Sequence, residues 1–334
     1  MDYASYDCPS KQSFDERGRS VKNGAKRNPQ DLEGDGEFCV FTTVRWDPML
    51  MKSSENAAAS CNQSCPIYML EHHWTRLQVA KWSTSFTRSS PAELLRQLLT
   101  AVQHWLAKNP DQRVDALRLK HKVYADSRTV TDVMPVPRIP IEHLFPRTLG
   151  RPTDPPPSPE WEVYLDDRPT EVSETTMYKT SERFCYDRAR ATAGIESYVE
   201  RKEVLLFNPE GEIMDGSITS VYFWRDGQWV TPESMSGGQQ GTTRRWTFQK
   251  KLCTDGKIYA SDLRDGEVIW LSNASKGYFR GRFVSNPAQA PLKADYSALL
   301  SFEQAVDGSA WTGTRYGPGV GKVQSCTAYL TASS

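Results

Sequence analysis

The sequence predicts an α+β fold with two sheet-bearing domains, and three observations support this prediction. Segments with alternating apolar residues occur in both halves of the chain, and segments with helical apolar spacing lie among them. Five prolines fall within Pro152–Pro159, where no regular element can persist. We therefore expect a disordered tail over 1–36, a small α/β domain over 37–150, a Pro-rich linker over 151–160 and a larger domain over 161–334.

The first domain is expected to combine strands with two helices. Ser90-Pro91 is typical of a helix start, because serine accepts hydrogen bonds from free backbone N–H groups and proline suits the first turn. Asp47-Pro48 is expected to end the first strand. The strands are predicted over 38–46, 116–124 and 129–136, the helices over 68 to about 86 and 91 to about 107, and a loop over 49–66.

The second domain is expected to be rich in antiparallel strands. One helix is predicted around Tyr186–Ile195 and another after Gly241, and Asn208-Pro209-Glu210-Gly211 is typical of a turn between strands. Asp215, considered alone, is typical of a turn residue. The strands are predicted over 161–165, 203–207, 220–224, 228–231 and 267–271.

The composition argues against several classes of function. Lys and Arg together number 41, as do Asp and Glu, so the 334-residue chain has a net charge of zero, which argues against nucleic-acid or anionic-membrane partners. No apolar run approaches the roughly 18 residues of a membrane span. The seven cysteines are scattered and odd in number, and the first residues are too polar for a secretory signal. We expect a reduced, cytoplasmic, globular protein.

A few polar residues are open to a structural or a chemical interpretation. Arg45, on the first strand, could pair with a substrate carboxylate or form a surface salt bridge, and the sequence leaves both open. His73 is expected to pack or to form a hydrogen bond rather than to bind a metal. Cys61 and Cys65 lack further ligands at zinc-binding spacing, so no metal site is expected.

Four segments of the second half are informative because of their order. They are Y-K-T-S-E-R-F-C-Y-D-R-A-R from Tyr178, N-P-E-G-E-I-M-D-G-S-I-T-S-V-Y-F-W from Asn208, W-V-T-P-E-S-M-S-G-G-Q-Q-G-T-T-R-R from Trp229 and V-I-W-L-S-N-A-S-K-G from Val268. Upstream, His73-Trp74-Thr75-Arg76-Leu77 is similar to an H-x-x-R-L segment. Over roughly residues 38–290, the chain resembles the class IV aminotransferases, the fold-type IV pyridoxal-phosphate enzymes. Its V-R-W-D-P and K-T-S-E-R segments most resemble the fungal-type 4-amino-4-deoxychorismate lyases of that family.

The resemblance implies a fold, a cofactor and a set of site residues. The fold is that of the D-amino acid aminotransferases, with a small α/β domain and a larger pseudo-barrel domain, usually in a homodimer. The cofactor is pyridoxal 5'-phosphate, and Lys179 matches the lysine that holds it covalently and moves the proton. Arg76, Thr242 and Thr243 match positions that bind the cofactor phosphate. Ser275 matches a position with phosphate or substrate contacts.

Asp215 matches the position of a family glutamate that hydrogen-bonds the pyridine nitrogen and keeps the ring an electron sink. The missing methylene shortens the reach of the carboxylate by about 1.5 Å. The backbone must therefore come closer, or water must bridge the gap, or the electron sink is weaker. Two further departures are Ser220, at the position of an aminotransferase asparagine, and Tyr178, at the position of a histidine often found in the lyases.

The resemblance leaves three functions open, all with a small amino-carboxylate as the substrate. The first is a lyase that eliminates pyruvate and yields 4-aminobenzoate or a related aromatic amine. The second is an aminotransferase that acts on a D-amino acid or an (R)-amine. The third is a repurposed relative in secondary metabolism, with altered or lost cofactor chemistry.

Overall fold

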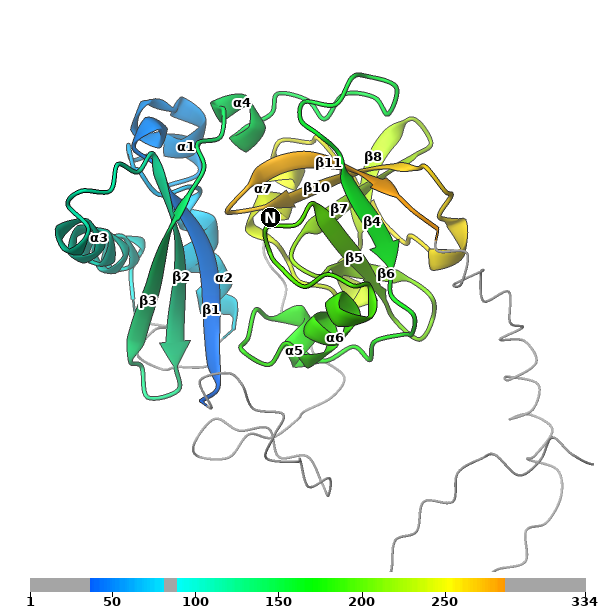
Figure 1. Cartoon of the computed structure of the whole chain (residues 1–334), viewed down its shortest axis with the longest axis horizontal. Helices are drawn as coiled ribbons and strands as arrows, with labels where there is room; N and C mark the ends of the chain where they lie inside the picture. The colour runs from blue at the N-terminus through cyan, green and yellow to red at the C-terminus, as the bar shows by residue number, and fades with distance from the viewer. Residues whose placement is uncertain (1–36, 81–88, 286–334) are drawn as a thin grey trace, which may run out of the picture. The chain divides into compact units, whose positions relative to one another are not determined.

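The computed structural model describes residues 37–80 and 89–285, which fold around two β-sheets (Figure 1). The expected tail over 1–36, the end of the helix expected to reach residue 86, and the chain beyond residue 285 lie outside the described residues. The predicted α+β class is confirmed. None of the helices in the described ranges has the length and apolar character needed to cross a bilayer.

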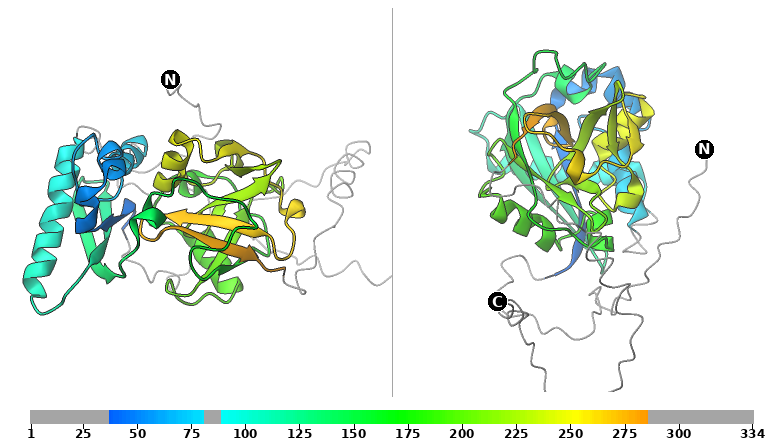
Figure 2. Two further views of the ribbon diagram at one scale, coloured as in Figure 1. Left: turned by 90° about the horizontal axis from the view of Figure 1, so that it is seen from above. Right: turned by 90° about the vertical axis from the view of Figure 1, so that its right-hand side faces the viewer.

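The smaller sheet is antiparallel and has the order β1-β2-β3, formed by β1 (Cys39–Trp46), β2 (Ala116–Tyr124) and β3 (Thr129–Val136). One face packs against α2 (Leu70–Val79) and α3 (Pro91–Lys108), through the apolar residues that alternate along β1 and β2. Figure 2 shows α3 on the side of this sheet away from the larger one. The other face of β1 and β2 is therefore free to border the larger sheet.

The segment expected as a loop over 49–66 contains two short helices, so that expectation was wrong. They are η2 (Pro48–Lys52) and α1 (Ser54–Ala58). The side chain of Ser53 accepts a hydrogen bond from Asn56 N at 3.1 Å and so begins α1. The buried amide of Asn56 then donates to the carbonyls of Cys65 and Ile67 at 2.8 and 3.1 Å, which fixes the segment against the core.

The larger sheet has eight strands in the order β6-β5-β4-β11-β10-β7-β8-β9. Its two edges meet, because Ile213 N donates to Ile258 O at 2.7 Å and Ala260 N donates to Gly211 O at 2.8 Å. The sheet therefore curls on itself around an apolar core. The strands are β4 (Trp161–Leu165), β5 (Lys202–Phe207), β6 (Ile213–Gly216), β7 (Ser220–Arg225), β8 (Gln228–Pro232), β9 (Thr254–Gly256), β10 (Val268–Asn273) and β11 (Gly277–Phe283).

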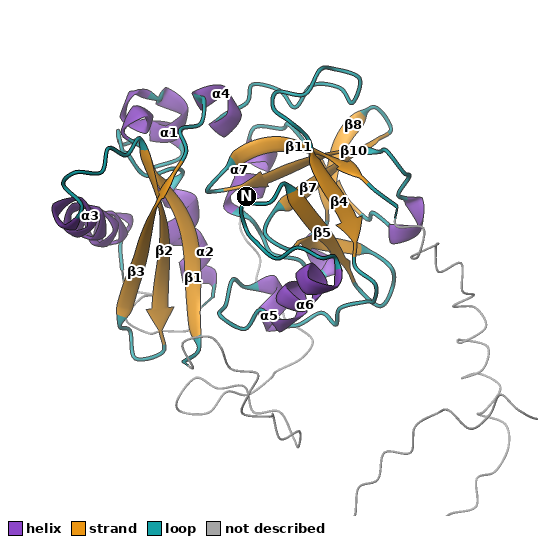
Figure 3. Cartoon of the chain, viewed as in Figure 1, coloured by secondary structure: helices purple, strands orange, loops and turns teal. Residues whose placement is uncertain are grey.

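Three of these strands, β6, β9 and β11, were not expected, and Asp215 lies in β6 rather than in a turn. The helices around this sheet include α5 (Glu174–Met177), α6 (Phe184–Thr192) and α7 (Thr242–Gln249). The Tyr186 hydroxyl donates to the Thr176 carbonyl at 3.1 Å, which holds α5 and α6 side by side (Figure 3). Short helices also occur at α4 (Ile141–Leu144), η4 (Ser234–Ser236) and η5 (Ala260–Asp262).

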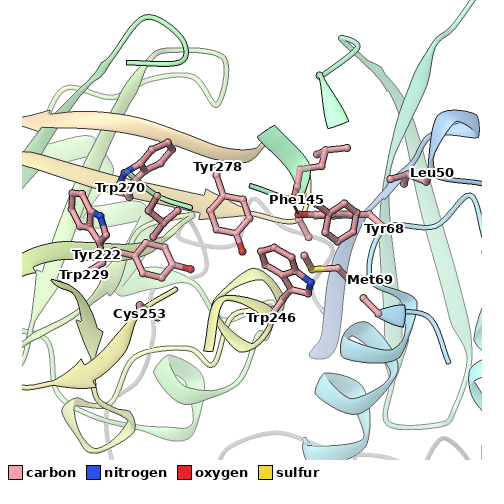
Figure 4. Close-up of a cluster of buried hydrophobic side chains, with 14 of the residues drawn as sticks. Leu50, Tyr68, Met69, Phe145, Tyr222, Trp229, Trp246, Cys253, Trp270 and Tyr278 are labelled. Atoms are coloured by element: carbon pink, nitrogen blue, oxygen red, sulfur yellow. Dashed lines mark hydrogen bonds between the residues drawn. The ribbon is translucent and has the colours of Figure 1, made fainter. Parts of the chain in front are cut away.

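The two sheets are joined by a buried aromatic cluster (Figure 4). Tyr68, just before α2, packs edge-to-face on Phe145 with ring centroids 5.1 Å apart, and Phe145 packs in the same way on Trp246 of α7 at 5.3 Å. Trp246 in turn lies 5.9 Å from Tyr278 of β11. Edge-to-face pairs add to the stabilisation that burial gives, so this cluster fixes α7 relative to both sheets.

Candidate functional site

The backbone around Lys179 pairs with the edge of β1. Phe41 N donates to Lys179 O, and Ser181 N donates to Cys39 O, both at 2.8 Å. The Lys179 amine lies 5.2 Å from the centroid of the Phe41 ring and donates to Gln239 Oε1 at 3.4 Å. Lys179 is therefore held between the smaller sheet and the loop that precedes α7.

The surroundings of Lys179 favour its neutral form. Burial lowers the pKa of Lys179 well below its usual value, and the nearby charges of Arg183 and Arg76 lower this pKa further. The carboxyl of Asp215 acts in the opposite direction but is not sufficient to reverse the shift. An uncharged amine is the form that attacks a carbonyl carbon and takes up a proton, so Lys179 is suited to both tasks.

Asp215 is buried near Lys179 and the loop before α7. Its carboxylate accepts hydrogen bonds from the backbone N–H groups of Gly216, at 3.0 Å, and of Gln239. The pKa of Asp215 is raised to about 8, mainly by burial and also by the nearby Glu203, and the charge of Lys179 only partly opposes this shift. The loop comes this close because position 238 is glycine: a Cβ there would lie 2.0 Å from Met214 O.

The turn that follows Asp215 is fixed by the buried carboxylate of Glu203. This carboxylate accepts hydrogen bonds from Ser217 N at 2.9 Å, from Ile218 N at 3.3 Å and from Thr219 Oγ1 at 2.6 Å. Several donors on one buried carboxylate compensate for its lost hydration. Glu203 therefore holds the end of β6, and with it Asp215, in one position.

Arg76 and the start of α7 converge. Arg76 Nη2 donates to the carbonyl of Gln240 at 3.2 Å, next to the N-cap residue Gly241. In the described part of the chain, no carboxylate forms an ion pair with Arg76, and no side chain caps α7. Burial and the charge of Arg245 lower the pKa of Arg76 to about 10. A guanidinium beside the free N–H groups of Thr242 and Thr243 is a suitable site for a phosphate.

A chain of buried hydroxyl groups lies behind the start of α7. Thr243 Oγ1 accepts from Ser272 Oγ at 2.8 Å, and Thr243 O accepts from Thr247 Oγ1 at 2.8 Å and from the Tyr278 hydroxyl at 2.9 Å. The Tyr222 hydroxyl lies 3.0 Å from both Thr247 Oγ1 and Ser272 Oγ. These bonds fix the orientation of the first turn of α7 and so of its N–H groups.

The structure thus brings Lys179, Asp215, Arg76, Thr242 and Thr243 together around the loop before α7. Gln239 was not predicted from the sequence, but its side chain contacts Lys179 and its backbone contacts Asp215. The only signal for Gln239 was its place in Gly-Gly-Gln-Gln-Gly, directly before a helix start. An amine, a buried carboxyl and an anion site at one junction fit a ligand with an aldehyde, a basic ring nitrogen and a phosphate.

Ser275 and Arg45 contact each other instead of this group. Ser275 N donates to Asn273 Oδ1 at 3.0 Å, and Ser275 O accepts from Arg45 Nη1 at 3.3 Å. Arg45 is fully buried, pairs with Asp47 at 2.9 Å and donates to Pro137 O at 3.0 Å. The interpretation of Arg45 as part of a surface salt bridge is therefore wrong, because its ion pair with Asp47 is buried. Its contacts give no support to a role in binding a substrate carboxylate.

His73 lies behind the site, fully buried in α2. Its Nδ1 lies 2.6 Å from Thr42 Oγ1, as expected for a residue that packs and forms a hydrogen bond. Burial lowers the pKa of His73 well below its usual value, and the charges of Arg76, His72 and Lys179 lower it further. His73 is therefore neutral and adds no charge to the site.

Comparisons with known proteins agree with this geometry. The family model described as amino-transferase class IV matches residues 40–282. A Schizosaccharomyces pombe protein assigned as an aminodeoxychorismate lyase is 30% identical over 152 residues, 42% of this chain and 63% of that protein. The aminodeoxychorismate lyase of Saccharomyces cerevisiae is 32% identical over 136 residues, 36% of each chain. The chain thus spans less than two thirds of either yeast relative.

A solved structure shares the fold. A Mesorhizobium loti protein assigned as an amino-acid aminotransferase superposes with a TM-score of 0.53 and 20% identity, over 74% of this chain and all of that one. The predicted fold of the class IV aminotransferases, with a small antiparallel sheet and a curled larger sheet, is confirmed. The chain therefore belongs to the class IV aminotransferase family.

Proposed function

We propose that the chain is a pyridoxal-phosphate-dependent lyase that resembles 4-amino-4-deoxychorismate lyase. In this reaction a cyclic amine loses pyruvate and becomes 4-aminobenzoate or a related aromatic amine. The observation that carries the proposal is the convergence of the Lys179 amine with Asp215 and with the anion site at Arg76 and α7. The names of the two yeast relatives favour the lyase over the other reactions of the family.

The residues present fit pyridoxal 5'-phosphate. Arg76 and the N–H groups of Thr242 and Thr243 would hold the phosphate, since a half-buried guanidinium that forms no ion pair with a described carboxylate lies beside a helix start without a side-chain cap. Lys179 would bind the aldehyde carbon, and Asp215 would face the ring nitrogen. When bound, the cofactor supplies an electron sink for the carbanion that proton removal leaves.

Lys179 is the base in the proposed reaction. Its amine takes the proton from the ring carbon that carries the substrate amine, and its lowered pKa leaves the amine unprotonated for this step. The C–O bond to the enolpyruvyl group then breaks, pyruvate leaves, and the ring becomes aromatic. Because aromatisation drives the elimination, a short Asp215 side chain is less of a handicap here than in transamination, which depends more on a strong electron sink.

Two finer features of the proposal rest on the family resemblance. Members of the family usually form homodimers, and we propose the same for this chain. We also propose that it acts in the cytoplasm on a small amino-carboxylate, with the scattered, odd-numbered cysteines and zero net charge as support.

The test is the release of pyruvate in the absence of an amino acceptor. The holoenzyme is incubated with 4-amino-4-deoxychorismate, and pyruvate and 4-aminobenzoate are measured together. The proposal predicts equal amounts of both products, with no product from Lys179→Ala. Product formation that requires an added 2-oxo acid would instead identify an aminotransferase. A protein that binds no cofactor and releases no pyruvate would be a repurposed relative.

A further inference from the structure

The face of the smaller sheet that borders Lys179 is rich in cations. Arg118, Lys120 and Lys122 alternate along β2 and pair with Arg45, Thr43 and Phe41 of β1, so their side chains share one face of the sheet. The intervening β2 residues pack into the apolar core with α2 and α3. The Lys120 amine lies 4.7 Å from the Phe41 ring centroid, and the Lys179 amine lies 5.2 Å from the same centroid. The cationic face therefore reaches the site.

The larger sheet adds another cation to this border, Lys276. It lies in the turn between β10 and β11, where Asn273 Oδ1 accepts from Lys276 N at 2.8 Å and fixes the turn. The Lys276 amine lies 4.2 Å from the Trp161 ring centroid and donates to Tyr198 O at 3.1 Å. Burial is the main reason for the lowered pKa of both Lys276 and Lys179, and the charge of Arg118 lowers both further, whereas Glu203 acts in the opposite direction on Lys276 and Asp215 does so on Lys179. Arg45, which pairs with Arg118 across β1 and β2, donates to Ser275 O at 3.3 Å, one residue before Lys276, so the turn that carries Lys276 lies beside this cationic face.

Three of these cations have no anionic partner in the described ranges. Lys122 pairs with Asp132 at 3.0 Å, but no described carboxylate forms an ion pair with Arg118, Lys120 or Lys276. Arg118 Nη1 points to the Met134 sulfur at 2.8 Å, and a thioether is only a weak acceptor. Half-buried cations that repel one another are unfavourable unless an anion binds among them.

We propose that Arg118, Lys120 and Lys276 form an anion subsite beside Lys179 that binds the carboxylates of a dicarboxylate substrate. The inference rests on the proposed function for the identity of the reacting amine, and it adds the residues that select the substrate. A substrate with two carboxylates neutralises more of this charge than a monocarboxylate does. The aromatic product, which keeps one carboxylate after pyruvate leaves, is therefore held less tightly than the substrate.

The test compares two inert probes, benzene-1,3-dicarboxylate and benzoate, whose binding to the holoenzyme is measured by titration calorimetry. We expect the dicarboxylate to bind more tightly. Arg118→Gln and Lys276→Gln should each weaken dicarboxylate binding about ten-fold, as expected for one charge-assisted contact, and should change benzoate binding much less. Arg118→Lys, which keeps the charge, should recover part of the loss.

The matched control is Lys122→Gln, on the same strand and face, because Asp132 already neutralises that charge. It should leave the ratio of the two affinities unchanged. Thermal melting of each variant separates loss of the subsite from loss of the fold. Equal affinities for the two probes, or an equal effect of Arg118→Gln and Lys122→Gln, would overturn the subsite.

The outcomes also separate the subsite from the proposed reaction, because probe binding requires no turnover. For the lyase substrate, Arg118→Gln should raise KM about ten-fold and leave kcat within about two-fold, since the subsite binds and does not react. Probe selectivity without pyruvate release would refute the reaction alone. Pyruvate release with no selectivity would refute the subsite alone.

Discussion

Substitution of Arg76 should separate the binding of the cofactor phosphate from the stability of the fold. In Arg76→Gln, the lost hydrogen bond to Gln240 O is worth about 1 kcal/mol. Burial and the charge of Arg245 lower the pKa of Arg76 from 12.5 to about 10, so the fold disfavours this cation. Its removal should therefore raise the free energy of unfolding and offset the lost hydrogen bond. The cofactor-free variant should therefore melt within a few degrees of the wild type. The lost phosphate contact, about 1.5–3 kcal/mol, should weaken cofactor binding about ten- to hundred-fold.

The assay titrates the cofactor-free protein with pyridoxal phosphate and, separately, with pyridoxal, which lacks the phosphate. Arg76→Gln should raise Kd for pyridoxal phosphate and leave Kd for pyridoxal within about two-fold. Arg96→Gln is the control, because Arg96 lies on the exposed face of α3, where it pairs with Glu93. An equal loss of affinity for both ligands, or no loss for either, would refute the assignment of the phosphate site.

Two further substitutions test the region around Asp215. The pKa of Asp215 is about 8 in the folded protein and 3.8 in an unfolded chain, so the folded state binds this proton more tightly. The free energy of unfolding of the cofactor-free protein should therefore fall as the pH rises from about 4 to about 8. Asp215→Asn should therefore gain stability relative to the wild type over that range in thermal melts, and a pH-independent difference would contradict the shifted pKa. Gly238→Ala should melt lower and bind the cofactor more than about ten-fold more weakly, because its Cβ would lie 2.0 Å from Met214 O. The control is Gly194→Ala, at φ +65°, where an added Cβ would meet no described atom within 4 Å, so it should lower the free energy of unfolding by only about 1 kcal/mol. Equal effects of the two substitutions would count against the close contact at Gly238.

The elements that sequence analysis found are those with strong local signals. The strands at 116–124 and 129–136 alternate regularly, and Ser90-Pro91 begins α3 as its capping chemistry predicts. β11 was missed because Arg280 interrupts its apolar pattern. Arg280 is nevertheless buried, since its guanidinium pairs with Glu160 at 3.3 Å and donates to Pro152 O at 2.8 Å. Those partners lie far away in the sequence, so no local pattern predicts them.

In the site, too, residues in recognisable sequence segments were predicted, and contacts between distant parts of the chain were not. The order of the four segments, together with the upstream H-x-x-R-L segment, carried the family resemblance that predicts Lys179, Asp215 and Arg76 as one group, and the structure brings these residues together. The contacts of Gln239 depend on how the loop before α7 packs against β6, which the sequence does not show. For Arg45 the sequence leaves open a substrate carboxylate or a surface salt bridge, because neither its burial nor its contacts can be read from a local pattern. Arg45 is buried because Asp47, two residues along the chain, neutralises it where the two sheets meet.

We propose that Lys179 holds pyridoxal phosphate covalently at the junction of the two sheets. Purified holoenzyme is reduced with borohydride, digested, and its peptides are mapped by mass spectrometry. A pyridoxyl-phosphate group is expected on Lys179 and on no other lysine, including Lys120 and Lys276 of the proposed anion subsite. A label on another lysine, or bound cofactor with no label on Lys179, would contradict it.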